Sequence, residues 1–141
     1  AWIDEQVPAG DGVYLYYAGY ARGHKVNRFE ERQIGLLMMK RDRYVARAAD
    51  TEGALVTRKL VIDGDALTLN AEAPAGSIAV QVLDEQGAPI PGFTFADSRT
   101  VTGDVLEAPV TWARPLADLK GQPVRVQFRL RDARLYAFDI H

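Results

Sequence analysis

Carboxylates are the residues of this chain best suited to catalysis. Glycoside hydrolysis, for example, uses two carboxyl groups that flank the bond to be cleaved. Asp97, Asp104 and Glu107 fall within residues 93–109, the longest stretch of the second half without a clear strand pattern. We therefore treat these three as candidate catalytic residues, although acidic side chains in loops more commonly face only water.

The chain has few residues that suit other kinds of catalysis or metal binding. The chain has no cysteine and two histidines, and a zinc site needs three or four converging ligands. It contains none of the sequence motifs of zinc proteases, phosphate-binding loops, serine hydrolases with a nucleophile elbow, or dinucleotide-binding domains. Asp63 and Asp65 flank Gly64 and could hold calcium through carboxylate and backbone oxygens, but this triplet is first of all a turn sequence. Apart from calcium, no cofactor is expected.

Aromatic side chains offer a different kind of chemistry, because their faces stack on the apolar face of a sugar ring. Tyr14, Tyr16 and Tyr20 lie close in sequence to Arg22 and His24, which makes this the segment densest in aromatic and cationic side chains. These five are the candidate ligand-binding residues, with the aromatics as anchors and the polar groups as orienting partners. The alternative is that the tyrosines simply cover the edge of a folded domain.

Composition places the chain among ordinary folded proteins. Its 141 residues are 48% hydrophobic and 26% charged, with a net charge of −2, which suits one domain or one domain plus a fragment. Cationic residues outnumber acidic ones between residues 22 and 47, a pattern more typical of a solvated surface than of nucleic-acid binding. No apolar run approaches the roughly 20 residues of a membrane span. The chain begins at Ala1, and we expect it to be part of a longer protein.

Alternating apolar residues predict an all-β second half. The clearest strand covers residues 124–130, and a turn at 131–133 would connect it to residues 135–140 in a terminal hairpin. Residues 60–62 and 67–69 flank the Asp-Gly turn as a second hairpin, and residues 78–82 and 110–112 form further strands. Seven or eight strands from about residue 55 predict an antiparallel, jelly-roll-like β-sandwich over residues 53–141.

The first third, residues 1–52, is predicted to form β-hairpins. Residues 13–17 are rich in strand formers, and their alternation places Tyr14 and Tyr16 on one face and Tyr17 on the other. We expect residues 33–39 and 44–48 to pair through a turn at 40–43. Helix propensity over residues 29–49 supports a helix as the alternative, which Gly35 would weaken by about 1 kcal/mol.

Two groups of short motifs resemble one family. The sequences VYLYYAG at 13–19, QIGL at 33–36 and RDRYV at 41–45, with His24 between them, resemble the last blade of the five-bladed propellers of glycoside hydrolase families 32 and 43. Residues 67–70, 91–93, 103–104, 110–112 and 124–136 resemble the β-sandwich that follows that propeller. The catalytic carboxylates of this clan lie on earlier blades, so none is transferred to this chain. The resemblance makes His24 a candidate contact for a pocket or an ion.

The resemblance implies a carbohydrate-associated β-sandwich, an accessory or glycan-binding region of a hydrolase-like protein. An oligosaccharide or polysaccharide would then be its partner, and a secreted or periplasmic location would follow. The first alternative is a small carbohydrate-active enzyme that works through the loop carboxylates or a site centred on His24. The second is a structural or oligomerisation module without ligand. A lone blade cannot close a propeller, so residues 1–52 would pack on the sandwich or pair with another copy.

Overall fold

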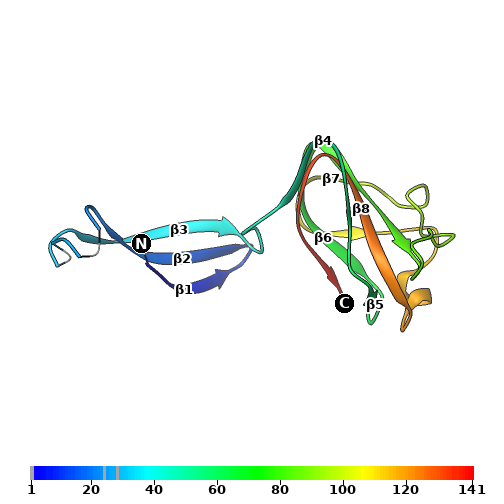
Figure 1. The fold of residues 1–141 in the computed structure, drawn as a ribbon, viewed down its shortest axis with the longest axis horizontal. Helices are drawn as coiled ribbons and strands as arrows, with labels where there is room; N and C mark the ends of the chain where they lie inside the picture. The colour runs from blue at the N-terminus through cyan, green and yellow to red at the C-terminus, as the bar shows by residue number, and fades with distance from the viewer. Residues whose placement is uncertain (1, 24, 28) are drawn as a thin grey trace. The chain divides into compact units, whose positions relative to one another are not determined.

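The computed structural model describes residues 2–23, 25–27 and 29–141, and it confirms the all-β prediction (Figure 1). The chain forms two compact units, Ala1–Arg43 and Tyr44–His141. The boundary expected after residue 52 falls inside a strand of the second unit, β4 (Arg47–Val56). Among the described residues the one helical segment is the short 3-10 helix η1 (Leu116–Leu119).

The first unit is a three-stranded antiparallel sheet of β1 (Trp2–Ala9), β2 (Gly12–Tyr20) and β3 (Arg32–Lys40), in that order. The strand predicted at residues 33–39 is therefore confirmed, and the helix alternative is not. Its predicted partner was wrong, because β3 pairs with β2 and not with residues 44–48. The apolar pattern specified a strand but not which strand would lie beside it.

The second unit is one sheet in the order β4-β8-β6-β7, with the short β5 (Leu60–Val61) also paired to β8. Its longest strands are β6 (Leu67–Leu83) and β8 (Pro123–Ile140), and β7 covers Val101–Val110. Each long strand contains two segments that the sequence pattern separated. The prediction of seven or eight strands was therefore too high, and part of the stretch predicted to be irregular is β7.

A bend in this sheet replaces the predicted terminal hairpin, which was wrong. Asp132 has a left-handed φ of 40°, yet β8 continues through it and pairs with β4 and β6 on both sides. The buried positions change from even numbers up to Leu130 to odd numbers from Ala133. The extra residues at this bend lie in the neighbouring strands, in β4 between Ala49 and Glu52 and in β6 between Glu72 and Ser77. Bulges of this kind bend strands without reversing them. In Figure 1, β4, β6 and β8 turn at the same end of the unit.

The two halves of the bent sheet enclose one core. Its large, fully buried side chains come from both halves of β6, from β8 and from the loop before β7, and include Leu67, Leu69, Val80, Val82, Phe93, Val126 and Phe128. Trp112 packs against this core, and its indole Nε1 donates a hydrogen bond of 2.8 Å to the backbone oxygen of Val80. The second unit therefore has a contiguous core of its own.

The hairpin predicted around the Asp-Gly turn was also wrong, because β5 pairs with β8 and not with β6. Instead, the backbone N–H groups of Asp65 and Ala66 donate to the carbonyl oxygen of His141, each at 3.0 Å. A β-carbon on Gly64 would come within 2.5 Å of that same oxygen. The turn therefore holds the end of β8.

A truncated chain that starts at Tyr44 is expected to fold cooperatively, because β4 to β8 share one core. A chain that starts at Gly53 should melt at a lower temperature, because it lacks the pairing of Ala48 and Ala49 with Arg134 and Ala133. Thermal unfolding followed by circular dichroism compares the two. A broad, non-cooperative melt of the chain that starts at Tyr44 would contradict this boundary.

Candidate functional site

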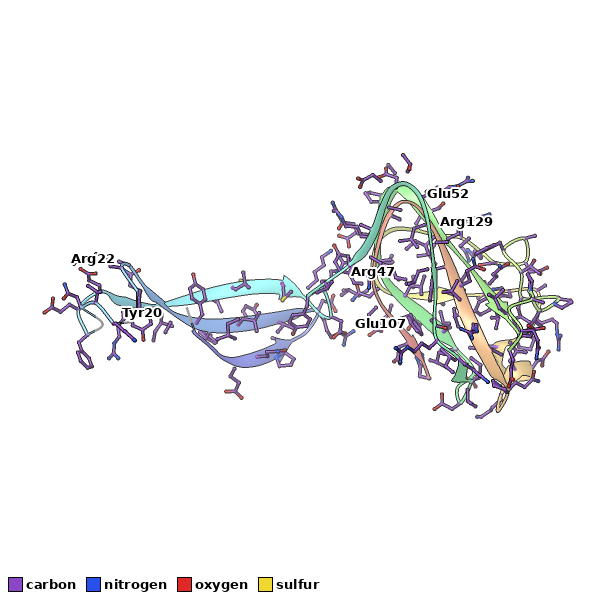
Figure 2. The ribbon with its side chains drawn as sticks, viewed as in Figure 1. Tyr20, Arg22, Arg47, Glu52, Glu107 and Arg129 are labelled. Atoms are coloured by element: carbon purple, nitrogen blue, oxygen red, sulfur yellow. The ribbon has the colours of Figure 1, made fainter. Side chains whose placement is uncertain are left out.

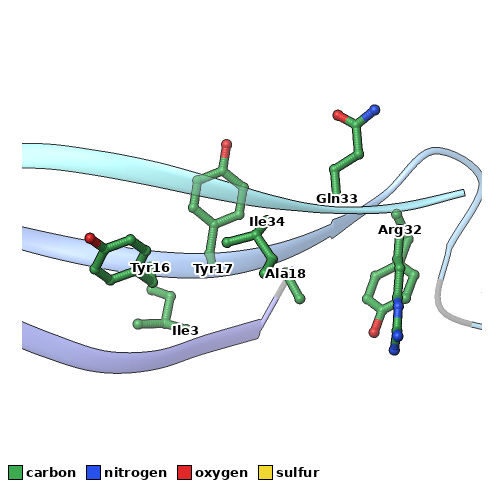
Figure 3. A pocket seen from close by; sticks show the side chains of 8 residues that line it. Ile3, Tyr16, Tyr17, Ala18, Arg32, Gln33 and Ile34 are labelled. Atoms are coloured by element: carbon green, nitrogen blue, oxygen red, sulfur yellow. The ribbon is translucent and has the colours of Figure 1, made fainter.

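A large hollow with a volume of about 810 Å³ lies on the first unit. It is lined by Ile3, Tyr16, Tyr17, Ala18, Tyr20, Arg32, Gln33 and Ile34, which come from all three strands (Figure 3). We call it the tyrosine hollow. The second unit has smaller hollows, for example one of about 110 Å³ beside Glu72 and Asp132.

The regular pairing of β2 with β3 creates this arrangement. Directly opposed residues of an antiparallel pair point to the same face. Ala18 lies opposite Ile34 and Tyr20 lies opposite Arg32, so these side chains share a face with Tyr16. Tyr17 and Gln33 project from the other face, as Figure 3 shows. The face with Tyr16 therefore combines two phenol rings, those of Tyr16 and Tyr20, with the guanidinium of Arg32.

Tyr17 explains why β3 contains a glycine. Tyr17 lies opposite Gly35, and a β-carbon at Gly35 would lie 2.2 Å from Cζ of the Tyr17 ring. The ring is therefore laid across the glycine, in the manner by which aromatic residues cover strand glycines. Tyr17 keeps 37% of its surface exposed and Tyr16 keeps 47%. Both rings remain accessible to a ligand.

Arg22 does not join the tyrosines as predicted. Its guanidinium makes a two-pronged ion pair with the carboxylate of Glu31 across the loop between β2 and β3. Figure 2 labels Arg22 on this loop. The hydrogen bonds to Arg22 hold the pKa of Glu31 below its usual range, and the same pair raises the pKa of Arg22. Both groups thus stay charged at neutral pH, and Arg22 serves to close the loop.

Among the predicted ligand-binding residues, Tyr16 and Tyr20 line the hollow. Tyr14 shares their face, opposite Met38, but does not belong to the lining. His24 lies outside the described residues. Arg32 was missed, because its place beside Tyr20 follows from the β2–β3 register, and the sequence-based pairing gave β3 a different partner. A prediction that paired residues 12–20 with 32–40 would have found it.

The candidate catalytic carboxylates have different structural settings. Asp97 accepts hydrogen bonds from the backbone N–H of Thr94 at 3.0 Å and from the Thr94 hydroxyl at 2.7 Å. These bonds lower the pKa of Asp97, the opposite of what a general acid at neutral pH requires. Asp104 and Glu107 are exposed on β7 (Figure 2 labels Glu107). Asp97 thus stabilises a turn, whereas the other two lie on a strand.

Asp63 and Asp65 are exposed on the turn that holds His141. Within residues 2–23, 25–27 and 29–141, no group of three or more histidines or carboxylates is placed to hold a metal ion. The described part of the chain contains no helix of the length and apolarity that crossing a membrane requires.

Comparison with known proteins finds no relative of this chain. No family model, no curated protein and no solved structure matches it.

Proposed function

We propose that the chain is a carbohydrate-binding region and that the tyrosine hollow is its binding site. The observation that carries the proposal is the gathering of Tyr16, Tyr20 and Arg32 on one face of the sheet, around one hollow. The part-exposed rings offer apolar faces to a pyranose. The guanidinium of Arg32 supplies hydrogen bonds that orient it.

Arg32 favours an acidic sugar over a neutral one. A guanidinium presents two parallel N–H donors to a carboxylate, and this charge-assisted pair is stronger than a neutral hydrogen bond. We therefore propose an oligosaccharide that contains uronic acid as the ligand class.

The hydrogen bonds and positions of the candidate catalytic carboxylates favour binding without catalysis over the enzyme alternative. Asp97 is engaged with Thr94, and its lowered pKa suits a permanent anion. Asp104 and Glu107 lie on β7 in the second unit, whereas the tyrosine hollow belongs to the first. Among the side chains that the structure describes, no carboxylate lines the proposed site.

Titration of neutral and uronic oligosaccharides by calorimetry tests the proposal. Tyr16→Ala and Tyr20→Ala should each weaken uronic oligosaccharide binding at least about tenfold, the effect of removing an anchoring aromatic. Arg32→Gln should remove the preference for the acidic sugar while leaving weak neutral binding. Tyr44→Ala, which removes an exposed tyrosine outside the hollow, is the matched control and should bind normally.

Thermal melts of each variant establish that the first unit remains folded. Binding that survives both tyrosine substitutions would place the site elsewhere. Hydrolysis of the oligosaccharide by the chain would overturn the proposal of binding without catalysis and favour Asp104 and Glu107 on β7.

A further inference from the structure

A second, smaller hollow lies on the opposite face of the sheet of the first unit, where β2 ends and β3 begins. Its volume is about 270 Å³, and its lining includes Tyr17, Glu31, Gln33 and Gly35. Tyr17 and Gln33 also border the tyrosine hollow, but their side chains project to this second face, away from Arg32 (Figure 3). We call the second cavity the Tyr17 hollow.

The register of β2 with β3 brings the lining residues to one face. Tyr17 lies opposite Gly35, and Gly19 lies opposite Gln33. Just beyond the last strand pair, the backbone N–H of residue 21 donates to the carbonyl oxygen of Glu31 at 3.4 Å. Because side chains alternate along a strand, residues 17, 19 and 21 share a face with residues 31, 33 and 35.

The Tyr17 ring is the apolar surface of this hollow. A β-carbon on Gly35 would lie 2.5 Å from Cε1 of the ring, and one on Gly19 would lie 3.7 Å from Cε2. The ring therefore lies along the sheet surface, beside two residues that have no side chain to cover it. Tyr17 is 37% exposed, and that exposed area is on the side of the ring away from the strands. A ring presented in this way can stack on the apolar face of a sugar.

Gln33 and Glu31 are the polar groups beside the ring. The Gln33 side chain is exposed, and its amide can both donate to and accept from sugar hydroxyls. Two donor groups of Arg22 hold the Glu31 carboxylate, whose two oxygens have further acceptor sites for a hydroxyl. Among the described residues, no cationic side chain lines the Tyr17 hollow. An acidic sugar would therefore find no charged partner here, whereas a neutral sugar would find both donors and acceptors.

We propose that the Tyr17 hollow binds one neutral sugar ring, an inference that rests on the proposed carbohydrate-binding function and adds a second site to it. A sugar with equatorial hydroxyls, such as glucose, has apolar C–H faces that stack on Tyr17 while its hydroxyls reach Gln33 and Glu31. The hollow is smaller than the range of about 300–1,000 Å³ typical of pockets for drug-sized ligands, which suits a single ring. The two faces of the sheet then hold different sugars, an acidic one beside Arg32 and a neutral one beside Gln33.

Two oligosaccharides added to the full chain test the inference, a neutral hexasaccharide derived from cellulose and a hexasaccharide of galacturonic acid. NMR spectra of isotope-labelled tyrosine rings distinguish the two sites, because Tyr17 and Tyr16 project from opposite faces of the sheet. The neutral probe should shift the ring signals of Tyr17 more than those of Tyr16. The acidic probe should shift the ring signals of Tyr16 and Tyr20.

Substitutions at Tyr17 separate sugar stacking from the covering of Gly35. Tyr17→Leu still covers the glycine but has no aromatic ring, and it should weaken binding of the neutral probe at least about tenfold. Tyr17→Phe keeps the ring and should bind that probe as the unsubstituted chain does. Gln33→Ala should weaken it by about two- to tenfold, the effect of losing a hydrogen bond. Tyr14→Leu, on the same strand but in the lining of neither hollow, is the matched control and should not change binding.

Thermal melts establish that each variant is folded, and Gln33→Ala decides if Tyr17→Leu unfolds. Neutral binding that Gln33→Ala and a folded Tyr17→Leu leave unchanged would overturn the inference. Binding of the acidic probe alone would also overturn it and leave the proposed function intact. Neutral binding at Tyr17 without acidic binding would support the Tyr17 hollow and refute the assignment of an acidic sugar to the tyrosine hollow. Failure of both probes to bind would overturn both proposals.

Discussion

Replacing Phe128 with alanine is expected to lower the free energy of unfolding by about 3–5 kcal/mol. Phe128 is fully buried in the middle of β8, between Leu55 of β4 and Val80 of β6. Its ring centroid lies 5.2 Å from that of Phe138, which comes from the other half of the same bent strand. The substitution therefore leaves a cavity where both halves of the sheet meet. Unfolding in denaturant measures the loss, with the same dependence of the free energy of unfolding on denaturant concentration expected for both proteins.

Arg129→Ala is the matched control on the opposite face of β8. The Arg129 guanidinium carbon lies 4.5 Å from the centre of the Phe95 ring, in a setting that remains partly exposed. Removing this contact should cost under about 1 kcal/mol. Equal losses for the two substitutions would show that the inward and outward faces of β8 are assigned wrongly.

Strand positions in this protein could be predicted from the sequence, whereas strand connections could not. The alternation at residues 124–130 correctly identified the inward face of β8, including Phe128. Residues 131–133 carry the composition of a turn, but a bulge uses the same residue types. Ala133 and Arg131 both pair with β4, so the chain continues there as one bent strand beside a bulge in β4. That pairing joins residues far apart in the chain, and no local pattern reports it.

In the candidate site, too, the residues on one strand could be predicted from the sequence, whereas those brought in by strand pairing could not. The density of aromatics singled out Tyr16 and Tyr20 as candidate ligand-binding residues, and both line the hollow, because rings on one strand face are visible as alternation. Arg32 could not be found in this way, since its position beside Tyr20 depends on the register of two strands separated by a loop. Arg22 was selected on proximity in sequence, yet Glu31 pairs with it across that loop.

Gly76→Ala is expected to destabilise the second unit by at least about 3 kcal/mol. Gly76 lies in β6 at the register shift between Glu72 and Ser77, where the sheet bends. A β-carbon there would come within 1.9 Å of the backbone oxygen of Arg131 and 2.2 Å of that of Asp132. Both obstructing atoms belong to the backbone of β8 at its own bend. Relief would therefore require the two strands to separate at the bend that closes the core.

Gly87→Ala distinguishes this steric effect from the ordinary cost of replacing a glycine. Gly87 has a left-handed φ of 90°, and a β-carbon there would meet nothing within 4 Å. Its substitution should cost only about 1–2 kcal/mol, from the backbone conformation alone. Denaturant melts of both variants give the comparison. If Gly76→Ala costs no more than Gly87→Ala, the bend tolerates a side chain between β6 and β8, and close backbone approach is not what maintains it.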